Sequence, residues 1–275
     1  MRGAPFPLLG TAGRAALRAF ADPCTLFAFD LDGTLAPIVA DPASAVVPEA
    51  VRERLLALDR AAPVVVITGR GRADAQRRLG FRPRHLVGNH GAEGLPGRAL
   101  AERAYARLGK RWEEQLGALL PDRAALGVAL EGKGATLSLH YRKAADRACA
   151  RRAILRAAAR LSPPPRRIHG KYVENLVPPD APGKGEALAL LVRYLGCRRA
   201  FYIGDDETDE DVFRLGRPAV FGVRVGRKPA SAARSWLRDQ SQIVPVLDEL
   251  LSLQRGPAAA CRTRGESGAL PPDPG

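Results

Sequence analysis

The sequence predicts an α/β protein with a parallel central sheet, into which a segment of α+β type is inserted. Three short apolar runs, at residues 26–29, 64–67 and 201–203, are continuous rather than alternating, which is typical of strands buried on both faces of a parallel sheet. A helical pattern follows each run, which indicates βα alternation. The middle of the chain, about residues 97–177, instead carries alternating patterns that are typical of antiparallel strands.

The elements of the predicted core follow in order along the chain. Residues 1–23 mix Gly, Pro, Ala and Arg without a sustained period, so we expect a flexible N-terminal segment. Residues 48–58 repeat apolar side chains at helical spacing. Residues 185–195 are nearly all helix formers, and Gly196 behind them fits a helix C-cap. The Pro- and Gly-rich tail, residues 253–275, is expected to be disordered.

The inserted region has a pattern of its own. Residues 136–142 alternate apolar with polar side chains and predict a half-exposed antiparallel strand. An amphipathic helix is predicted at residues 144–161, and the prolines within residues 162–165 end it. Residues 172–177 resume an alternating strand. The predicted domains are therefore a split core domain, residues 24–96 and 178–252, and an inserted α+β domain, residues 97–177.

Composition argues against several classes of protein. The net charge of +14 supplies general affinity for phosphate, but the arginines are scattered, only six of the 43 basic residues are lysine, and aromatic residues make up 5%. We therefore expect no nucleic-acid partner. No apolar run approaches the roughly 20 residues that span a bilayer, so we expect no membrane partner either.

The cysteines and the N-terminus bear on localisation. Four cysteines lie far apart with no CxxC pair, which favours neither a zinc site nor a disulfide framework and fits the cytoplasm. The apolar stretch near the start is short and broken by Pro7, Gly10 and Arg14, which makes a poor secretory signal. An Arg-rich organellar presequence stays open as an alternative.

Acidic residues follow two of the predicted strands. Asp30 and Asp32 come after the first run, on one side of an extended chain and roughly 7 Å apart, and residues 205–211 after the last run include six carboxylates. Ligand sites in open α/β sheets lie outside the carboxyl ends of the strands, so these groups should converge. Carboxylates this crowded must take up protons or hold a cation. A few hard oxygen ligands, with room for phosphate and water, suit Mg²⁺.

Paired carboxylates suit phosphoryl transfer through an aspartyl-phosphate. Asp30 would attack phosphorus, and Asp32 would protonate the leaving alkoxide and then take a proton from the hydrolytic water. Thr68, after the second run, would hydrogen-bond a phosphate oxygen, and Lys184, opening a helix, would supply a positive charge. Structural alternatives are open: Thr68 as a helix N-cap, Lys184 as a solvated side chain, and residues 205–211 as an acidic helix start.

Four segments together resemble the motifs of the haloacid dehalogenase (HAD) superfamily of phosphatases. They are DLDGT at 30–34, TGR at 68–70, Lys184 and GDDETDED at 204–211. Further strings are similar to the trehalose-6-phosphate phosphatase family: GNHGAE at 88–93, HGKYVENLVP at 169–178 and PGKGEAL at 182–188. The resemblance covers about residues 24–250. It implies a Rossmann-like HAD core with a mobile α+β cap of the C2 type, which agrees with the predicted insertion.

The resemblance also implies which residues bind the metal. The ligands would be the side chains of Asp30 and Asp205 and the backbone carbonyl of Asp32. Asp206 and Asp209 would support the site from behind these ligands.

In the cap, the resemblance implies a set of residues that grip the sugar: Glu131, Lys133, Arg142, Lys171 and Glu174. A disaccharide phosphate offers hydroxyl groups to carboxylates and anionic oxygens to cations. Structural alternatives stay open, because Glu131 and Lys133 fit an exposed hairpin turn, and Lys171 and Glu174 fit a surface pair.

Three residues within these strings are assigned to substrate binding with a structural alternative. Asn89 and His90, in the loop after residues 85–88, would reach substrate where core and cap meet, or would serve the loop itself. Arg70 would contact substrate or pair with core carboxylates. His140 receives no role.

The expected function is Mg²⁺-dependent hydrolysis of trehalose 6-phosphate to trehalose and phosphate, a step of trehalose biosynthesis. The nearest alternative is another sugar phosphate as substrate, such as sucrose phosphate or a mannosyl-phosphoglycerate. The remote alternative is a non-catalytic module that binds anions or nucleic acid. We expect a monomer that acts in the cytoplasm on a small-molecule sugar phosphate.

Overall fold

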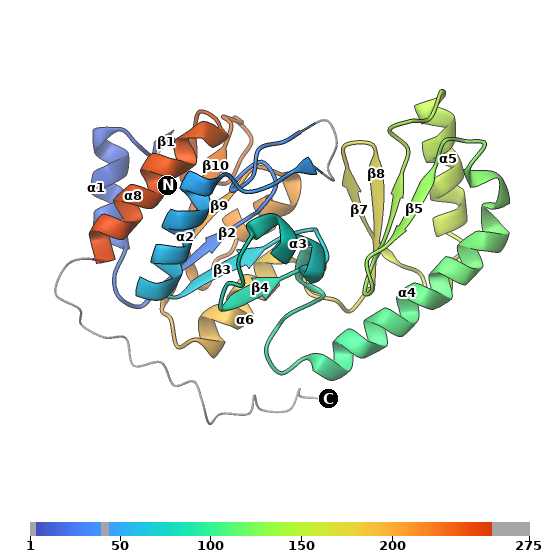
Figure 1. Cartoon of the computed structure of the whole chain (residues 1–275), viewed down its shortest axis with the longest axis horizontal. Coiled ribbons are helices and arrows are strands. Elements are labelled where there is room, and N and C mark those ends of the chain that lie inside the picture. The colour runs from blue at the N-terminus through green and yellow to red at the C-terminus, as the bar shows by residue number, and fades with distance from the viewer. Residues whose placement is uncertain (1–3, 40–43, 255–275) are drawn as a thin grey trace. The chain divides into compact units, whose positions relative to one another are not determined.

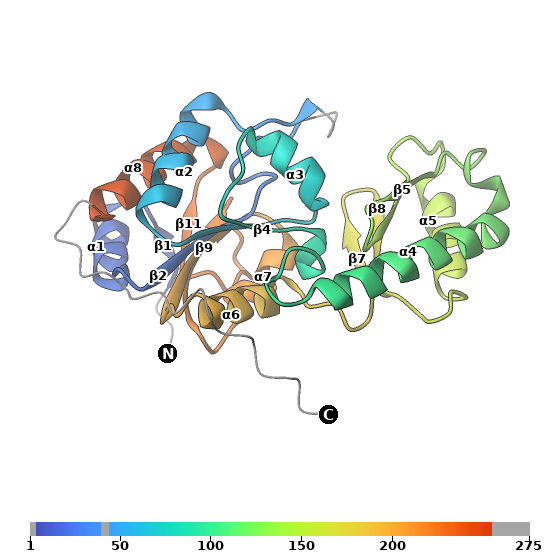
Figure 2. The same ribbon diagram turned by 60° about the horizontal axis from the view of Figure 1, so that its bottom comes forward.

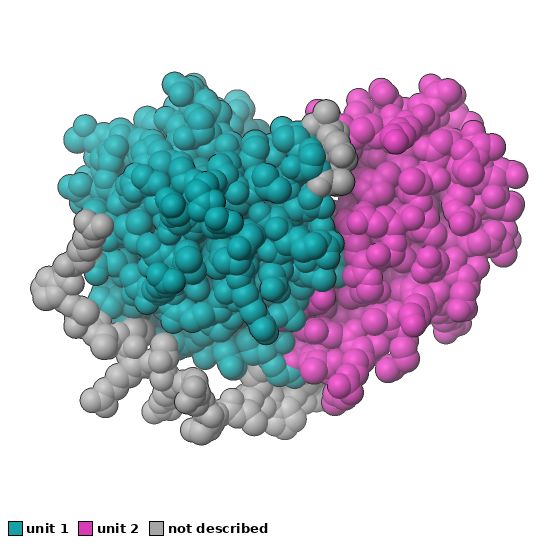
Figure 3. All heavy atoms as spheres, viewed as in Figure 1, with its two compact units in different colours: residues 1–91, 95–97, 183–275 teal, residues 92–94, 98–182 magenta. Residues whose placement is uncertain are grey.

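The computed structural model describes residues 4–39 and 44–254. The chain divides into two compact units, which Figure 3 distinguishes by colour. Unit 1 comprises Met1–Gly91, Leu95–Gly97 and Gly183–Gly275, and unit 2 comprises Ala92–Gly94 and Arg98–Pro182. Within the described ranges, no helix has both the length and the apolarity needed to cross a bilayer.

Unit 1 is built on a seven-stranded parallel sheet. In spatial order its strands are β1 (Phe6–Pro7), β11 (Ser235–Leu237), β10 (Ala219–Val225), β9 (Arg199–Gly204), β2 (Thr25–Phe29), β3 (Val64–Ile67) and β4 (His85–Val87). The three strands predicted from continuous apolar runs are confirmed as β2, β3 and β9. The order runs outward in opposite directions from β2 and β9, so this pair forms the switch point of the sheet.

Helices cover both faces of this sheet (Figures 1 and 2). They are α1 (Thr11–Phe20), α2 (Glu49–Ala61), α3 (Arg72–Leu79), α6 (Lys184–Tyr194), α7 (Glu210–Phe213) and α8 (Ile243–Gln254). Phe27 and Phe29 of β2 belong to the core formed with α1, α2, α3 and α8, whereas Leu26 and Ala28 face α6 and α7. Alternate residues of one strand thus enter two separate cores, which explains why the strand is apolar throughout.

The predicted helices at residues 48–58 and 185–195 are confirmed as α2 and α6. Gly196, expected as a C-cap, follows the α6 C-cap residue Leu195 and has φ +67°. This left-handed conformation carries little steric penalty for glycine, so the helix can end there.

The expectation of a flexible N-terminal segment is wrong for residues 4–23. Strand β1 pairs with β11, and Leu8 and Leu17 are each 1% exposed in the core. Gly13 lies so close to the chain before the helix that a Cβ would stand 2.2 Å from the Leu8 carbonyl oxygen. Because the anchoring apolar residues are few and α1 has no capping side chain, the sequence pattern did not reveal it. Of the expected disordered tail, residues 255–275 lie outside the described residues.

Unit 2 contains an antiparallel sheet in the order β5 (Ala129–Gly132), β6 (Leu137–His140), β8 (Val173–Val177) and β7 (Arg166–Gly170). Helices α4 (Ala99–Leu119) and α5 (Arg147–Ala158) pack on it around Trp112 and Ile154. The predicted strands and the α5 helix are present. The strand predicted to be half-exposed is more buried than that, because Ser138 is also 0% exposed and its hydroxyl donates to Asn175 Oδ1 at 2.6 Å.

Candidate active site

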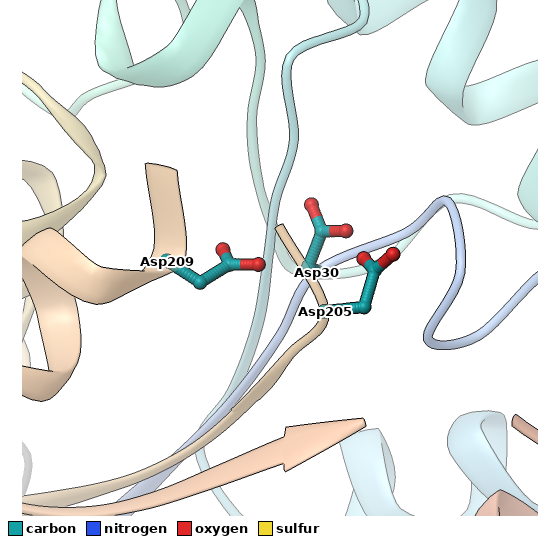
Figure 4. Close-up of side chains that lie close together, drawn as sticks. All are labelled: Asp30, Asp205 and Asp209. Atoms are coloured by element: carbon teal, nitrogen blue, oxygen red, sulfur yellow. The ribbon is translucent and has the colours of Figure 1, made fainter. Parts of the chain in front are cut away.

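The carboxylates of Asp30, Asp205 and Asp209 converge at the switch point between β2 and β9. Asp30 follows β2 and its backbone N–H donates to the Ile203 carbonyl of β9 at 2.9 Å. Asp205 follows β9, and Asp209 lies one turn further along (Figure 4). One carboxylate oxygen from each of the three lies within 4.8 Å of the others. The predicted convergence of residues from distant segments is therefore present in the fold.

A tight turn after β2 brings Gly33 against the carboxylate of Asp205. Gly33 N–H donates to the Ala36 carbonyl at 2.8 Å, and Gly33 has φ +80°. A Cβ at Gly33 would stand 2.2 Å from a carboxylate oxygen of Asp205. Both the left-handed backbone and the close approach require glycine at this position. The Gly of the DLDGT string thus has a conformational and a packing reason in this fold.

Lys184 joins two of the three carboxylates. Its Nζ lies 2.8 Å from Asp30 Oδ1 and 2.7 Å from Asp209 Oδ1, and the residue is 3% exposed. It is the first residue of α6, whose start at Gly183 aims the side chain into the strand ends. The alternative of a solvated lysine is therefore excluded. Burial lowers the pKa of Lys184, but Asp209 and Asp30 outweigh burial and hold the net pKa above its ordinary value, so the ammonium keeps its charge.

Asp209 and Asp205 differ in how their oxygens are satisfied. Asp209 Oδ1 also accepts from the Tyr202 hydroxyl at 2.6 Å, and Oδ2 accepts from the Asp206 backbone N–H at 2.9 Å. Asp205 Oδ1, by contrast, is buried without a hydrogen-bond partner. A buried anionic oxygen without a donor is costly in a folded protein. Asp205 therefore has a coordination position open, whereas Asp209 is already held by protein donors.

The protonation states of the cluster favour an added cation. Burial raises the pKa of Asp30 well above its usual range, with Lys184 opposing and Asp209 and Asp205 adding to the rise. Burial and then the charge of Asp209 raise the pKa of Asp205 to about 7. A divalent cation next to these two carboxyl groups would return both to the ionised form. The oxygen-only donor set and the open oxygen of Asp205 fit a hard divalent cation.

Asp32 lies outside this cluster and is held by Arg70. Arg70 Nε and Nη2 donate to the two carboxylate oxygens of Asp32, both at 2.7 Å, while Nη1 donates to Asp74 at 2.7 Å. The Asp32 side chain is 40% exposed, so solvent reaches it. Of the two roles considered for Arg70, the structure has the pairing with carboxylates. A two-pronged pair of this kind fixes orientation as well as charge.

Thr68, Asn89 and His90 lie together where β3 and β4 end. Thr68 is 1% exposed, its hydroxyl oxygen accepts from Arg70 N–H at 3.2 Å, and its carbonyl accepts from His90 N–H at 2.9 Å. Asn89 and His90 have φ of 52° and 60°, a left-handed conformation that is strained for residues other than glycine. The N-cap of α3 is Gly71, so the alternative of Thr68 as a helix cap is excluded.

Asp206 supports Asp209 through a capping box. Its carboxylate accepts from Glu207 N–H at 2.7 Å at the start of the short helix η4 (Glu207–Asp209), while its own N–H donates to Asp209. This arrangement orients Asp209 toward Lys184 and Tyr202.

The predicted sugar-binding residues all lie in unit 2, and contacts form two groups around two of them, Glu131 and Glu174. In the first, Glu131 Oε2 lies 2.7 Å from His140 Nε2 and 3.7 Å from Lys133 Nζ across strands β5 and β6. His140, which received no role, is thus the nearest partner of Glu131. The hairpin alternative describes this place only in part, because Lys133 is 16% exposed at its side chain.

The second group surrounds Glu174. This carboxylate is 2% exposed and accepts from Arg151 Nε at 2.8 Å, with His169 Nδ1 at 2.9 Å. The alternative of a surface pair with Lys171 is therefore wrong for Glu174. The Arg142 guanidinium lies 5.6 Å from the centre of the Tyr172 ring. Tyr172 directly follows Lys171 in the sequence.

Sequence reasoning missed several charged or polar residues that hold these groups in place: Tyr202, Arg224, Glu210, Arg151 and His169. Tyr202 was concealed inside an apolar strand run, although its position two residues before Gly204 puts it on the side of the sheet that α6 covers. The partners of the others lie between 5 and 23 positions away in the sequence. No spacing rule for a single helix or strand reports such pairs.

The chain matches a known family model and several curated proteins. The family model for trehalose-phosphatase matches residues 28–239. The chain is 31% identical to a probable trehalose-phosphate phosphatase 9 of rice, over 81% of the chain and 68% of that protein. It is 35% identical to a trehalose-phosphate phosphatase of Mycobacterium marinum, over 72% of the chain and 53% of that protein. The chain thus spans about two thirds of the rice relative and about half of the mycobacterial one.

Solved structures show the same fold. The C-terminal domain of trehalose-6-phosphate phosphatase from C. albicans aligns with a TM-score of 0.67 at 22% identity, over 91% of the chain and 99% of that domain. A trehalose-6-phosphate phosphatase of Aspergillus fumigatus aligns with a TM-score of 0.59 at 27% identity, over 91% and 99%. A haloacid dehalogenase-like hydrolase from Bacteroides thetaiotaomicron aligns with a TM-score of 0.53. The predicted α/β class and the HAD-like fold are confirmed.

Proposed function

The chain belongs to the trehalose-phosphatase family, and from this membership we propose that it hydrolyses trehalose 6-phosphate to trehalose and inorganic phosphate. The observation that carries the proposal is the side-chain cluster at the switch point, in which the buried Lys184 bridges the buried Asp30 and Asp209 while Asp205 keeps an open oxygen. A nucleophile, a fixed positive charge and a cation position lie within one cluster. Phosphoryl transfer requires little beyond such positioning and charge stabilisation.

Mg²⁺ is the proposed cofactor, bound by the side chains of Asp30 and Asp205 and by the backbone carbonyl of Asp32. When bound, it would offset the negative charge of the phosphate and of the nucleophile. The raised pKa values of Asp30 and Asp205 support this role, because a cation beside the two carboxyl groups would favour their ionised forms, and the carboxylate of Asp30 is its nucleophilic form. Asp206 and Asp209 would hold the site from behind, as their capping box indicates.

The proposed reaction has two displacements at phosphorus. First, an Asp30 oxygen bonds to phosphorus, the ester P–O bond breaks, and Asp32 gives its proton to the departing sugar oxygen. Second, Asp32 takes a proton from a water molecule, whose oxygen bonds to phosphorus as the bond to Asp30 breaks. The products are the free sugar and inorganic phosphate, and both aspartates return to their starting forms. Lys184 and Thr68 would hold phosphate oxygens throughout.

Arg70 fits this scheme as the residue that orients Asp32. Its two-pronged contact leaves the Asp32 carboxylate aimed in one direction although the side chain is 40% exposed. Direct contact of Arg70 with substrate is the less supported of its two roles, because its guanidinium donates to both carboxylate oxygens of Asp32 and to Asp74. Asn89 and His90 remain proposed substrate contacts at the end of β4.

We assign unit 2 the role of a sugar-binding cap. It corresponds to the domain predicted at residues 97–177, which is inserted into the split core domain of residues 24–96 and 178–252. Its proposed sugar ligands are Glu131, Lys133, Arg142, Lys171 and Glu174. The burial of Glu174 between Arg151 and His169 supports a carboxylate held in one orientation, which suits recognition of hydroxyl groups. The proposed setting is a monomer in the cytoplasm.

A panel of sugar phosphates tests the proposal. Purified protein with Mg²⁺ should release phosphate from trehalose 6-phosphate with a kcat/KM at least tenfold above that for sucrose 6-phosphate, a mannosyl-phosphoglycerate or glucose 6-phosphate, a difference of about 1.4 kcal/mol. The matched control is Asp30→Asn, which removes the nucleophile. A tenfold preference for another ester would show that trehalose 6-phosphate is not the preferred substrate. Absence of Mg²⁺-dependent phosphate release from every ester would contradict the proposed phosphatase activity.

A further inference from the structure

A buried arginine behind the acidic loop makes contacts that the proposed reaction does not use. Arg224 lies near the end of β10 and is 8% exposed. Its Nη2 donates to the Asp205 carbonyl at 2.6 Å, and its Nη1 donates to the Asp206 carbonyl at 3.1 Å. One guanidinium therefore binds the carbonyl groups of two consecutive peptide units, one on each side of the Asp206 Cα.

The arginine is itself fixed by a buried partner. Arg224 Nη1 donates to Glu210 Oε1 at 3.0 Å, and Glu210 is 2% exposed. The second oxygen of Glu210 accepts from the Ala232 backbone N–H at 2.9 Å. Glu210 thus links the guanidinium to the loop that leads into β11 and holds it in position against the two carbonyls.

The contacts of Arg224 matter because the backbone that it binds carries the Asp205 carboxylate. Asp205 has the buried oxygen without a partner, and its carboxylate packs against Gly33 with no room for a Cβ. A small rotation of the Asp205 backbone would move that oxygen away from Asp30. Residues 205–210 also carry five carboxylates, and a buried positive charge beside them reduces their mutual repulsion.

We propose that Arg224, held by Glu210, is a positioning residue for the cation site: its grip on the Asp205 and Asp206 carbonyls sets the direction of the Asp205 carboxylate before the cation arrives. The inference rests on the proposed function, since it presumes that Asp205 binds a divalent cation. Preorganised ligands bind metals more tightly because less order is created on binding, and partners behind metal ligands commonly govern affinity by 10- to 100-fold.

The test compares two arginine-to-lysine changes on one strand end. Arg224→Lys keeps the charge but loses the fork that reaches two carbonyls. Arg227→Lys is the matched control, because Arg227 is exposed three positions further on and stacks near Trp236. Isothermal titration with Mg²⁺, or Mn²⁺ binding followed by electron paramagnetic resonance, gives the dissociation constant without relying on turnover.

We expect the Mg²⁺ dissociation constant to rise about 10- to 100-fold in Arg224→Lys and less than twofold in Arg227→Lys. At saturating Mg²⁺, kcat of Arg224→Lys should return to within about threefold of wild type, because the reacting groups are unchanged and only the affinity for the cation is lowered. A role in folding alone would instead lower the melting temperature and leave the affinity for Mg²⁺ unchanged.

Unchanged affinity in a folded Arg224→Lys, with wild type binding normally, would overturn the inference alone. Failure of the wild type to bind Mg²⁺ saturably would overturn the proposed cation site and the inference with it. Arg224→Met combined with Glu210→Gln avoids a lone buried carboxylate and serves as the second variant. It should show the same loss of affinity. If neither variant folds, the pair serves the fold and the inference is wrong.

Discussion

The lysine–carboxylate cluster of unit 1 and the Glu131–His140 pair of unit 2 are held in opposite ways. In unit 1, the side chains of Lys184, Asp30 and Asp209 are 2%, 5% and 0% exposed, and Lys184 lies 154 positions from Asp30 in the sequence. In unit 2, the pair of Glu131 and His140 joins neighbouring strands and leaves the side chains 52% and 40% exposed. Glu174 is the exception, with a buried carboxylate whose partners are themselves partly exposed.

This difference indicates a division of labour. A buried ion cluster cannot rearrange without leaving a charge unpaired, which typically costs several kcal/mol, so its geometry is fixed by folding. An exposed pair contributes about 0–1 kcal/mol and adjusts easily to a new neighbour. Changes in the buried cluster of unit 1 should therefore remove the reaction for every substrate, and changes in the proposed sugar ligands of unit 2 should alter the rate for one substrate more than for another.

The largest effect is expected at the nucleophile. Asp30→Asn should lower kcat by more than about 10⁴-fold for every phosphate ester, because an amide cannot form the acyl phosphate. Phosphate release measures it, and far-ultraviolet circular dichroism checks that the fold persists. A folded variant that kept more than about 1% of the wild-type rate would contradict the aspartyl-phosphate scheme.

The effect of Asp32→Asn should depend on whether the leaving group of the ester needs a proton. For trehalose 6-phosphate we expect kcat to fall about 10²- to 10⁴-fold, because the sugar alkoxide needs a proton to depart. With p-nitrophenyl phosphate, whose phenolate leaves unaided, a stopped-flow burst of one equivalent of phenolate should persist. The matched control is Asp74→Asn, which removes the other carboxylate bound to Arg70. Equal losses of the first step on both esters would exclude Asp32 as the acid.

Binding of Mg²⁺ should weaken as the solution becomes acidic. The pKa of Asp205 is raised to about 7, so below that pH a proton competes with the cation. For one competing proton, the apparent dissociation constant should be about 100-fold higher at pH 5 than at pH 8. Calorimetric titration at the two pH values measures the ratio. Equal affinity at both would show that Asp205 is not a ligand.

The same shift predicts how pH affects the metal-free protein. The folded pKa of Asp205 lies above its ordinary value of 3.8, so the folded state binds the proton more tightly than the unfolded state. This contribution to stability is complete below about pH 4 and is lost as the pH rises through about 7. Added Mg²⁺ should therefore raise the melting temperature at pH 8 more than at pH 5. Equal increases at both pH values would contradict the shift.

The smallest effects are expected in unit 2. Glu131→Ala and Lys171→Ala should each lower kcat/KM for trehalose 6-phosphate about tenfold, or about 1.4 kcal/mol, because each removes one proposed sugar contact. For p-nitrophenyl phosphate the change should stay within about twofold, as for the exposed control Arg152→Ala. Equal losses on both esters would contradict the proposed difference between the units, since these residues of unit 2 would then affect the rate of reaction with any ester and not the preference for one substrate.

The strands that carry the site were predictable because burial on both faces leaves a local mark. Residues 26–29, 64–67 and 201–203 are apolar throughout since alternate side chains enter two different cores. Helix α1 was not predictable in this way. Its buried face rests on Leu17 and on the glycine at position 13, a pattern too short to stand out in sequence.

The same contrast holds within the site. Asp30 and the acidic loop could be found because they follow strand ends, and Lys184 because it opens a helix. That Asp209 is satisfied by Tyr202 and a backbone N–H, whereas Asp205 keeps an open oxygen, depends on contacts that only the fold creates. Arg70 pairs with Asp32 across 38 positions of the sequence. The sequence left two roles open for Arg70, contact with substrate and pairing with core carboxylates, and only the fold decides between them.

The pairing of β2 with β9 also has a consequence for how this protein is made. The five residue pairs from Thr25 with Arg199 to Phe29 with Ile203 join the two central strands, and all of unit 2 lies between them in the chain. A ribosome that has released only the first half of the sequence has therefore released the proposed nucleophile without its lysine, its acidic loop or the strand beside it. Long-range pairing of this kind folds late and slowly. Activity should appear during translation only after residue 209 has left the exit tunnel, so a truncated nascent chain would hydrolyse nothing.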